Sequence, residues 1–249
     1  MRILITNDDG VDAPGIRALE RTLTAYCARR GPAWSLITLA PDRGRSECGH
    51  SVSNLSELTL NRLSAQRYSL DGTPVDCVRV ALATLASDAD IVISGINAGA
   101  NLGVDLLMSG TMAAAREAAI EGRAALAISH YRRPDIPRTW DHVDPWLSEA
   151  LNQFFHRAEQ PSREKDFGML WNVNLPAIDP KSEPPEIVRC PVERQPFIRR
   201  GQLRWDSDLA RITVESDFHG RPREPGSDVD VCFGGQISLS EINPFSLAR

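Results

Sequence analysis

Four short apolar runs, each of five or six residues, constrain the fold of this chain more than any other feature of its first 130 residues. A continuous apolar run is typical of a strand buried on both faces, and strands that alternate with helices form parallel sheets. The repeat therefore predicts an α/β fold: a Rossmann-like, mostly parallel sheet with helices on both faces. The runs are residues 2–6, 34–39, 90–94 and 124–129.

The helices between these runs are marked by their end residues. Pro14 suits a first helical position, and the apolar pattern that follows it stops at Gly31. Thr73 and Asp76 are spaced as a capping box around a proline, which predicts the start of a second helix. A third helix is expected from about Thr111, where alanine and other good helix formers begin.

The second half of the chain is less regular, but it is expected to belong to the same single domain, 1–249. Residues 1–130 form the core that carries the site, and residues 131–249 complete the sheet and add a β-rich extension. The pattern predicts a helix over 145–158 and a strand over 169–174. It also predicts a hairpin at 55–60 and 66–70, and antiparallel strands near 187–192 and 211–214 that extend or project from the sheet.

Composition excludes several classes of protein. The net charge is −5, from 28 basic and 33 acidic residues, which gives no general electrostatic reason to bind nucleic acid polymers or acidic membranes. The five cysteines are widely spaced and never form Cys-x-x-Cys, which argues against a disulfide framework or a zinc knuckle. The first apolar run is too short for a signal peptide and no stretch is long enough for a membrane span, so we expect a cytoplasmic protein.

Two adjacent carboxylates, Asp8 and Asp9, follow the first apolar run. Neighbouring carboxylates repel each other, and a fold tolerates them when they bind a cation, share a proton or are fully solvated. Open α/β sheets bind ligands at the carboxyl ends of their strands. A bound cation is therefore the leading interpretation, and a solvated turn is the alternative.

Three loops that follow predicted parallel strands, residues 7–10, 40–54 and 95–110, are expected to meet at one edge of the sheet. Ser46 and Asn97 could add a hydroxyl and an amide oxygen to the acidic pair, a set that suits Mg²⁺ or Mn²⁺ better than zinc. The turn Ser109-Gly110-Thr111 at a helix start offers backbone N–H groups and hydroxyls that could bind an anion. Asn101 could contact a phosphoryl group or orient a water. Together they predict phosphate chemistry.

Each candidate also has a structural interpretation. Ser109 and Thr111 could cap a helix, Asn97 could serve a turn, and Ser46 could face water. The glycine-rich stretch 95–103 matches neither the dinucleotide fingerprint nor the P-loop. Three further side chains also have two interpretations. Arg43 and Arg45 could contact a substrate phosphate or be solvated, and His50 could be a general acid or a surface or structural residue. The convergence of the three loops is what favours the functional interpretation.

Five long motifs follow one another along the chain: NDDGVDAPG (7–15), APDRGRS (40–46), GTPVDCV (72–78), SGINAGANLG (94–103) and SGTMAAAREA (109–118). In this order they resemble the signatures of the SurE survival protein family of metal-dependent 5′/3′-nucleotidases. The resemblance implies a Rossmann-like core and one divalent cation per subunit, Mg²⁺, Mn²⁺ or Co²⁺. The cation ligands by motif position are Asp8, Asp9, Ser46 and Asn97. The residues beside the phosphate are Asn101, Ser109, Gly110 and Thr111.

The resemblance also implies hydrolysis of nucleoside monophosphates, with short-chain polyphosphate as a side substrate, and assembly as a homodimer or homotetramer. This chain ends soon after QISLSEINP, where family members continue into a further helix, and residues 195–223 match the family's projecting hairpin poorly. In-line attack by water is the preferred mechanism, and direct attack by Asp8 is the alternative. A broad acid phosphatase or exopolyphosphatase, and a non-catalytic nucleotide-binding stress protein, are the alternative functions.

Overall fold

The computed structural model describes residues 1–46, 48–54, 57–160 and 168–245. Its strands are β1 (Arg2–Thr6), β2 (Ser35–Pro41), β3 (Leu60–Ser64), β4 (Arg67–Leu70), β5 (Ile91–Asn97), β6 (Ala124–His130), β7 (Leu170–Leu175), β8 (Ile187–Arg189), β9 (Arg199–Asp206), β10 (Leu209–Ser216) and β11 (Ile237–Glu241). Its helices are α1 (Pro14–Arg30), α2 (Pro74–Ala83), the 3₁₀ helix η1 (Gly103–Leu107), α3 (Gly110–Ile120), α4 (Val143–Ala158) and α5 (Asp228–Phe233).

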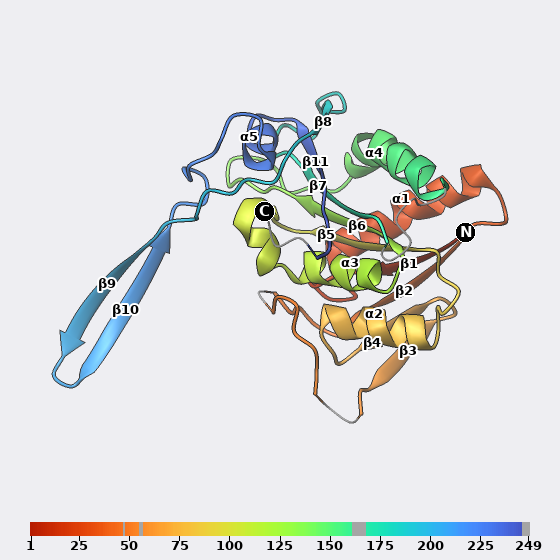
Figure 1. Cartoon of the computed structure of the whole chain (residues 1–249), viewed down its shortest axis with the longest axis horizontal. Coiled ribbons are helices and arrows are strands. Elements are labelled where there is room, and N and C mark those ends of the chain that lie inside the picture. Colours follow the sequence, from red (N-terminus) through yellow and green to blue (C-terminus); the bar gives the residue numbers. More distant parts are fainter. Residues whose placement is uncertain (47, 55–56, 161–167, 246–249) are drawn as a thin grey trace.

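Nine strands of the described ranges form one mixed sheet in the order β3-β4-β2-β1-β5-β6-β7-β11-β8 (Figure 1). Neighbouring strands from β4 to β7 are parallel, whereas β3 and β11 run antiparallel to β4 and β7. The chain leaves β1 for β2 on one side and later enters β5 on the other side of β1, so the strand order reverses there. The mostly parallel α/β fold predicted from the sequence is confirmed, and β7, β8 and β11 of the second half complete the sheet.

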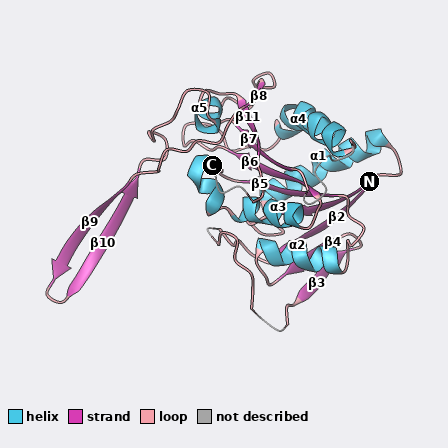
Figure 2. Ribbon diagram, in the orientation of Figure 1, coloured by secondary structure: helices cyan, strands magenta, loops and turns pink. Residues whose placement is uncertain are grey.

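Helices cover both faces of the sheet (Figure 2). Ile3 and Ile5 of β1 point to one face, where they pack in a cluster with apolar residues of α1 and α4. Leu4 points to the opposite face, against the apolar residues of α2 and α3. Because successive side chains of a strand alternate between faces, a strand that is apolar at every position is buried on both sides. This is why the continuous runs become central strands.

Local signals at the helix starts act as expected. The Thr73 hydroxyl accepts the Asp76 N–H at 3.1 Å, and the Asp76 carboxylate accepts the Thr73 N–H at 2.8 Å, which completes the predicted capping box of α2. Ser109 caps α3 by accepting the Met112 N–H at 3.0 Å. Each contact satisfies a backbone donor that has no partner inside the helix.

Two expectations for the strands need correction, and the structure adds one helix that the sequence did not predict. The first arm of the hairpin was expected at 55–60 but is β3, Leu60–Ser64, and residues 55–56 lie outside the described ranges. Its side chains are all exposed, so no apolar pattern marked it. The segment 187–192, expected to be antiparallel, forms only the short strand Ile187–Arg189, which pairs in parallel with β11. Pro191 has no N–H to continue a ladder, and α5 was not predicted at all.

Strands β9 and β10 form a separate antiparallel hairpin that projects from the body of the molecule (Figure 1). This confirms the predicted projecting strand near 211–214. No helix within the described ranges is long and apolar enough to cross a membrane. The cytoplasmic location expected from the sequence stays a prediction.

Candidate metal and phosphate site

Backbone and side-chain hydrogen bonds join the three predicted loops at the carboxyl ends of β1, β2 and β5. The carbonyl of Asp8 accepts the N–H of Arg45 at 2.7 Å, which ties the loop after β2 to the acidic pair. The Asp9 carboxylate accepts the N–H of Ala98 at 3.0 Å, which ties in the loop after β5. The predicted convergence of the loops is therefore confirmed, and it lies where the strand order reverses.

Two glycines allow the loops to approach this closely. Gly10 has φ +101°, and a Cβ there would lie 3.0 Å from the backbone carbon of Arg43. Gly110, the first residue of α3, has no side chain to push against Asp8, because a Cβ there would lie 2.8 Å from the Asp8 Cβ. The helix start and the acidic pair are thus in direct contact.

Asp8 is a buried carboxylate with an unusual environment. Its side chain, on a residue only 4% exposed, accepts a hydrogen bond from the Thr111 hydroxyl of α3. Burial raises the pKa of Asp8 to about 6; the Thr111 hydrogen bond opposes that rise and the charge of Asp9 adds to it. Burial also raises the pKa of Asp9. Both shifts mean that the folded chain disfavours two negative charges at this point.

The donor set fits a hard divalent cation. Across the described part of the chain, neither Asp8 nor Asp9 takes part in an ion pair with a Lys or Arg side chain. The same residues contain no group of three or more His, Cys, Asp or Glu side chains that could hold a metal. A cation here would therefore need neutral oxygens beside the two carboxylates, which is the type of ligand set that Mg²⁺ and Mn²⁺ accept.

The two predicted neutral ligands lie on loops that contact the acidic pair. Ser46 is exposed and directly follows Arg45, whose N–H binds Asp8. Asn97 ends β5 and directly precedes Ala98, whose N–H binds Asp9. The Asn97 amide donates to the Gly99 carbonyl at 2.9 Å, which leaves its side-chain oxygen as the available ligand atom. Their roles as ligands stay predictions.

Asn101 is held by residues of β6 and β7. Its side-chain NH₂ donates to the Ser129 hydroxyl at 2.8 Å, and its backbone N–H donates to the Asn174 side chain at 2.9 Å. The side chains of Asn172 and Asn174 both donate to the Asn101 carbonyl at 3.0 Å. These hydrogen bonds fix the backbone and the side-chain NH₂ of Asn101. Its side-chain oxygen remains available to contact a substrate.

Three polar side chains of the loop after β2 have structural partners. The Nε2 atom of His50 lies 2.7 Å from the Glu117 carboxylate on α3, so His50 ties the loop to the helix and is poorly placed as a general acid. Arg45 donates to the Asp71 carbonyl at 2.9 Å. Arg43 is exposed and lies 3.6 Å from the Asp42 carboxylate. Within this structure the structural interpretation holds for His50 and Arg45.

A family model described as "Survival protein SurE" matches residues 3–197 of the chain. The chain belongs to the SurE family. A putative 5′-nucleotidase of Nostoc sp. is 40% identical over 242 residues, which cover 97% of this chain and 99% of the relative. The 5′-nucleotidase SurE of Moorella thermoacetica is 44% identical over 258 residues, which cover 98% and 90%. The crystal structure of the SurE protein from Aquifex aeolicus superposes with a TM-score of 0.80 at 26% identity, covering 100% of this chain and 95% of that one.

Sequence reasoning missed the residues that support the loop after β5 in this SurE chain. Ser129, Asn172 and Asn174 hold Asn101, and only the alternate placement of two asparagines on one strand could have signalled them. Arg221 pairs with Asp105 and donates to the Leu102 carbonyl at 2.8 Å. It lies more than 100 positions further along the chain, so no local pattern points to it.

Replacing Gly110 with alanine should abolish most of the activity of this SurE protein without unfolding it. The new methyl group would displace Asp8, and a shift of about 1 Å in a reacting group can cost roughly 100-fold in rate. We expect a fall of about 100-fold in kcat with an unchanged circular dichroism spectrum. Gly44→Ala is the matched control, because its Cβ would lie 3.6 Å from the Asp9 carbonyl, an ordinary contact. Equal activity of the two variants would contradict the assigned role of Gly110.

Proposed function

We propose that this chain is a metal-dependent phosphomonoesterase that hydrolyses nucleoside 5′- and 3′-monophosphates to nucleoside and phosphate. The observation that carries the proposal is the pair of adjacent carboxylates, Asp8 buried and Asp9 half-buried, which form no ion pair with a Lys or Arg side chain among the residues that the structure describes. The relatives named 5′-nucleotidase, which match nearly the whole chain, support the same activity.

In this proposal, different residues of the chain bind the cation and the phosphate. Asp8, Asp9, Ser46 and Asn97 would hold one divalent cation, Mg²⁺, Mn²⁺ or Co²⁺. A cation bound there would neutralise phosphate charge and lower the pKa of a bound water. The first turn of α3, with Gly110 and Thr111, would face the phosphate with the positive end of the helix dipole.

The nucleoside alkoxide leaves as the phosphorus is attacked in line. The side-chain oxygen of Asn101 would orient the attacking water or the phosphoryl group. The Ser109 hydroxyl accepts the Met112 N–H as the cap of α3, and its own O–H would donate to the phosphate. Direct attack by Asp8 is the competing route, and trapping of a phosphorylated Asp8 by mass spectrometry would establish it.

A phosphate-release panel tests the proposed function. The substrates are 5′-AMP, 3′-AMP, 5′-GMP, 5′-CMP, p-nitrophenyl phosphate and tripolyphosphate, each with Mg²⁺, Mn²⁺, Co²⁺ or a chelator. We expect nucleotides to be the best substrates and the chelator to abolish turnover. Equal rates on p-nitrophenyl phosphate or faster rates on tripolyphosphate would identify a broad phosphatase or an exopolyphosphatase. No release from any nucleotide with any metal would contradict an enzymatic role.

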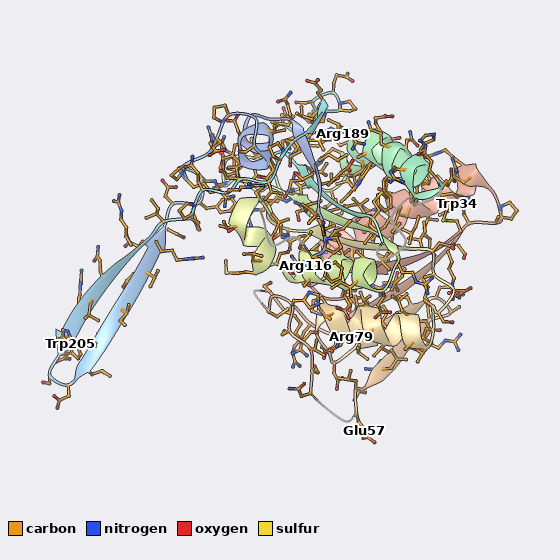
Figure 3. The ribbon with its side chains drawn as sticks, in the orientation of Figure 1. Trp34, Glu57, Arg79, Arg116, Arg189 and Trp205 are labelled. Atoms are coloured by element: carbon orange, nitrogen blue, oxygen red, sulfur yellow. The ribbon has the colours of Figure 1, made fainter. Side chains whose placement is uncertain are left out.

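We also propose that the protein is a homodimer or homotetramer joined through the β9–β10 hairpin. The register places Leu203, Trp205, Ile212 and Val214 on one face of the hairpin. The other face carries charged and polar residues together with Leu209. Trp205 is 66% exposed and Ile212 is 68% exposed (Trp205 is labelled in Figure 3). A two-stranded hairpin is marginally stable by itself in water, so its apolar face needs a cover. A second copy offers an identical apolar face.

Ile212→Glu should convert the oligomer to a smaller species in analytical ultracentrifugation, because a charge would be buried in the apolar contact. Thr213→Glu is the matched control, since the neighbouring position faces the opposite side of the hairpin. We expect the control to keep the oligomeric state of the unmodified protein. If both variants sediment alike, the apolar face is not the contact between subunits.

A further inference from the structure

A cavity of about 400 Å³ opens at the carboxyl end of β6. Tyr131 and the residues after it line one side, the segment that returns from the β9–β10 hairpin lines another, and α5 closes the third. Small-molecule sites typically measure about 300–1,000 Å³. None of the residues assigned above to the cation or the phosphate lines this cavity, so it is a separate subsite of suitable size.

Three aromatic side chains, Tyr131, His219 and Phe233, line the cavity. Tyr131 is 5% exposed and stacks on Phe233, with ring centroids 4.5 Å apart and 12° between the ring planes. The hydroxyl of Tyr131 lies 2.7 Å from Nδ1 of His219, whose own ring is exposed. Phe233 is half-buried and His219 is exposed, so these two rings have faces that a ligand can reach. Accessible aromatic faces are the surfaces on which planar heteroaromatic groups bind.

The rim of the cavity carries both hydrogen-bond donors and acceptors. Arg133 donates to both carboxylate oxygens of Asp135, at 2.9 and 2.8 Å, and about half of each side chain remains exposed. Arg223 lies 3.4 Å from Asp230 and is also partly exposed. Guanidinium and carboxylate groups are the side chains that pair with the donor and acceptor edges of nucleobases.

The cavity lies within reach of the phosphate end of the site. Asp8 follows β1 and Tyr131 follows β6, and these strands lie two positions apart in the sheet, which is about 10 Å. That length is comparable to the span from phosphate to base in a nucleoside monophosphate. Leu102, which follows Asn101, packs in one cluster with Tyr131. Ser129, two residues before Tyr131, holds the Asn101 side chain.

We propose that this cavity binds the nucleobase of the substrate, stacked on the exposed His219 ring beside Phe233, with the buried Tyr131 supporting both rings. The ribose would then cross over Asn101 to the phosphate at Asp8. This inference rests on the proposed nucleotidase function, because it names where the nucleoside part of that substrate lies. It gives the site a reason to prefer nucleotides over simple phosphate esters.

Kinetics of His219→Ala on two substrates test the inference. The exposed imidazole can be removed without opening the core, and losing a base–aromatic stack costs about 1–3 kcal/mol. We expect kcat/KM to fall about tenfold or more for 5′-AMP and to stay within about twofold for ribose 5-phosphate, which has no base. His156→Ala on α4 is the matched control, since His156 is exposed and does not line the cavity. It should change neither value.

A binding measurement keeps the inference testable without turnover. Equilibrium dialysis with adenosine and guanosine should show binding by the unmodified protein, and His219→Ala should weaken it about tenfold, or about 1.4 kcal/mol. No measurable nucleoside binding, or an equal fall of kcat/KM for 5′-AMP and ribose 5-phosphate, would overturn the nucleobase site. If the protein still hydrolyses ribose 5-phosphate in either of these cases, the nucleobase site is rejected but the phosphatase function is retained. Nucleoside binding without turnover of any ester would reject the enzyme and keep the cavity.

Discussion

Asp8→Asn is expected to lower kcat for nucleotide hydrolysis by about 1,000-fold, and Asp9→Asn by a similar factor. Electrostatic groups at a reacting centre are worth about 100- to 1,000-fold each, and here each change also removes an oxygen ligand charge from the proposed cation site. Phosphate release at saturating 5′-AMP and Mn²⁺ is the measurement. Asp12→Asn is the matched control, because Asp12 belongs to the same loop but its side chain is 72% exposed.

Thermal unfolding gives a readout of the same site that does not depend on activity. A ligand at 100 times its dissociation constant stabilises a folded protein by about 2.7 kcal/mol. Mn²⁺ should therefore raise the Tm of the unmodified protein by roughly 5–10 °C, since 1 kcal/mol shifts the Tm of a chain of this size by about 2–4 °C. It should have little effect on Asp8→Asn. If Asp8→Asn keeps full metal-dependent activity and the full Tm shift, the proposed site is wrong.

Acid should destabilise the protein through a buried pair of histidines behind the site. The Nε2 atoms of His130 and His142 lie 2.7 Å apart, and the two residues are 2% and 6% exposed. Nδ1 of His130 lies 2.9 Å from the Tyr131 carbonyl, which can only accept, so His130 donates there and its Nε2 accepts from His142. Thr139 lies 3.3 Å from the remaining nitrogen of His142. Each contact then joins one donor to one acceptor, and both rings are neutral.

The pKa values of both rings agree with this arrangement. Burial lowers the pKa of His130 to about 3, with further lowering by the charges of Arg132 and His142. Burial and Arg132 lower the pKa of His142 to about 4, against a small opposing effect of Asp141. Because the unfolded chain binds these protons near pH 6.5 and the folded chain does not, stability is present above that pH and is lost as pH falls toward 4.

Between pH 7 and pH 5 the histidine pair should therefore lower the free energy of unfolding by about 3 kcal/mol, a large part of the roughly 5–15 kcal/mol that a folded protein has. Asp8 should offset part of this loss, because its raised pKa favours the folded chain as the pH falls through 6. His142→Gln cannot titrate, so it should lose only about half as much over the same interval, although it is less stable at pH 7. Urea unfolding at the two pH values measures this. His156→Gln, at an exposed position, should behave like the unmodified protein, and a pH dependence equal in all three proteins would exclude the pair as its source.

The sequence was sufficient for the central strands and for the convergence of the site loops. Apolar runs at 2–6, 34–39, 90–94 and 124–129 can be buried only as central strands, and parallel strands direct their carboxyl ends to one edge. Asp8 and Asp9 stand at that edge because they follow the first run. The capping box of α2 could be predicted because its two residues, Thr73 and Asp76, are only three positions apart.

Other features were not readable because their partners are distant in the chain. The exposed strand β3 carries no apolar pattern, and β8 takes its direction from β11, about 50 residues later. The asparagines that bind the Asn101 carbonyl lie more than 70 positions away in the chain, so no local pattern showed that β7 holds this residue. Its place beside the phosphate stays a prediction. The sequence left His50 as a candidate general acid, because its contact with Glu117 of α3 joins residues 67 positions apart.

The amino-acid sequence by itself determined the α/β class, the order of the central strands and helices, and the acidic pair at a strand end, because these depend on short-range periodicity and on residues next to one another. Only the tertiary structure decided that Asp8 is buried against Gly110 and Thr111, that the Asn101 loop is held by β7, and that a cavity opens beside Tyr131. Burial and long-range hydrogen bonds depend on which segments the fold brings together, and no local pattern encodes that.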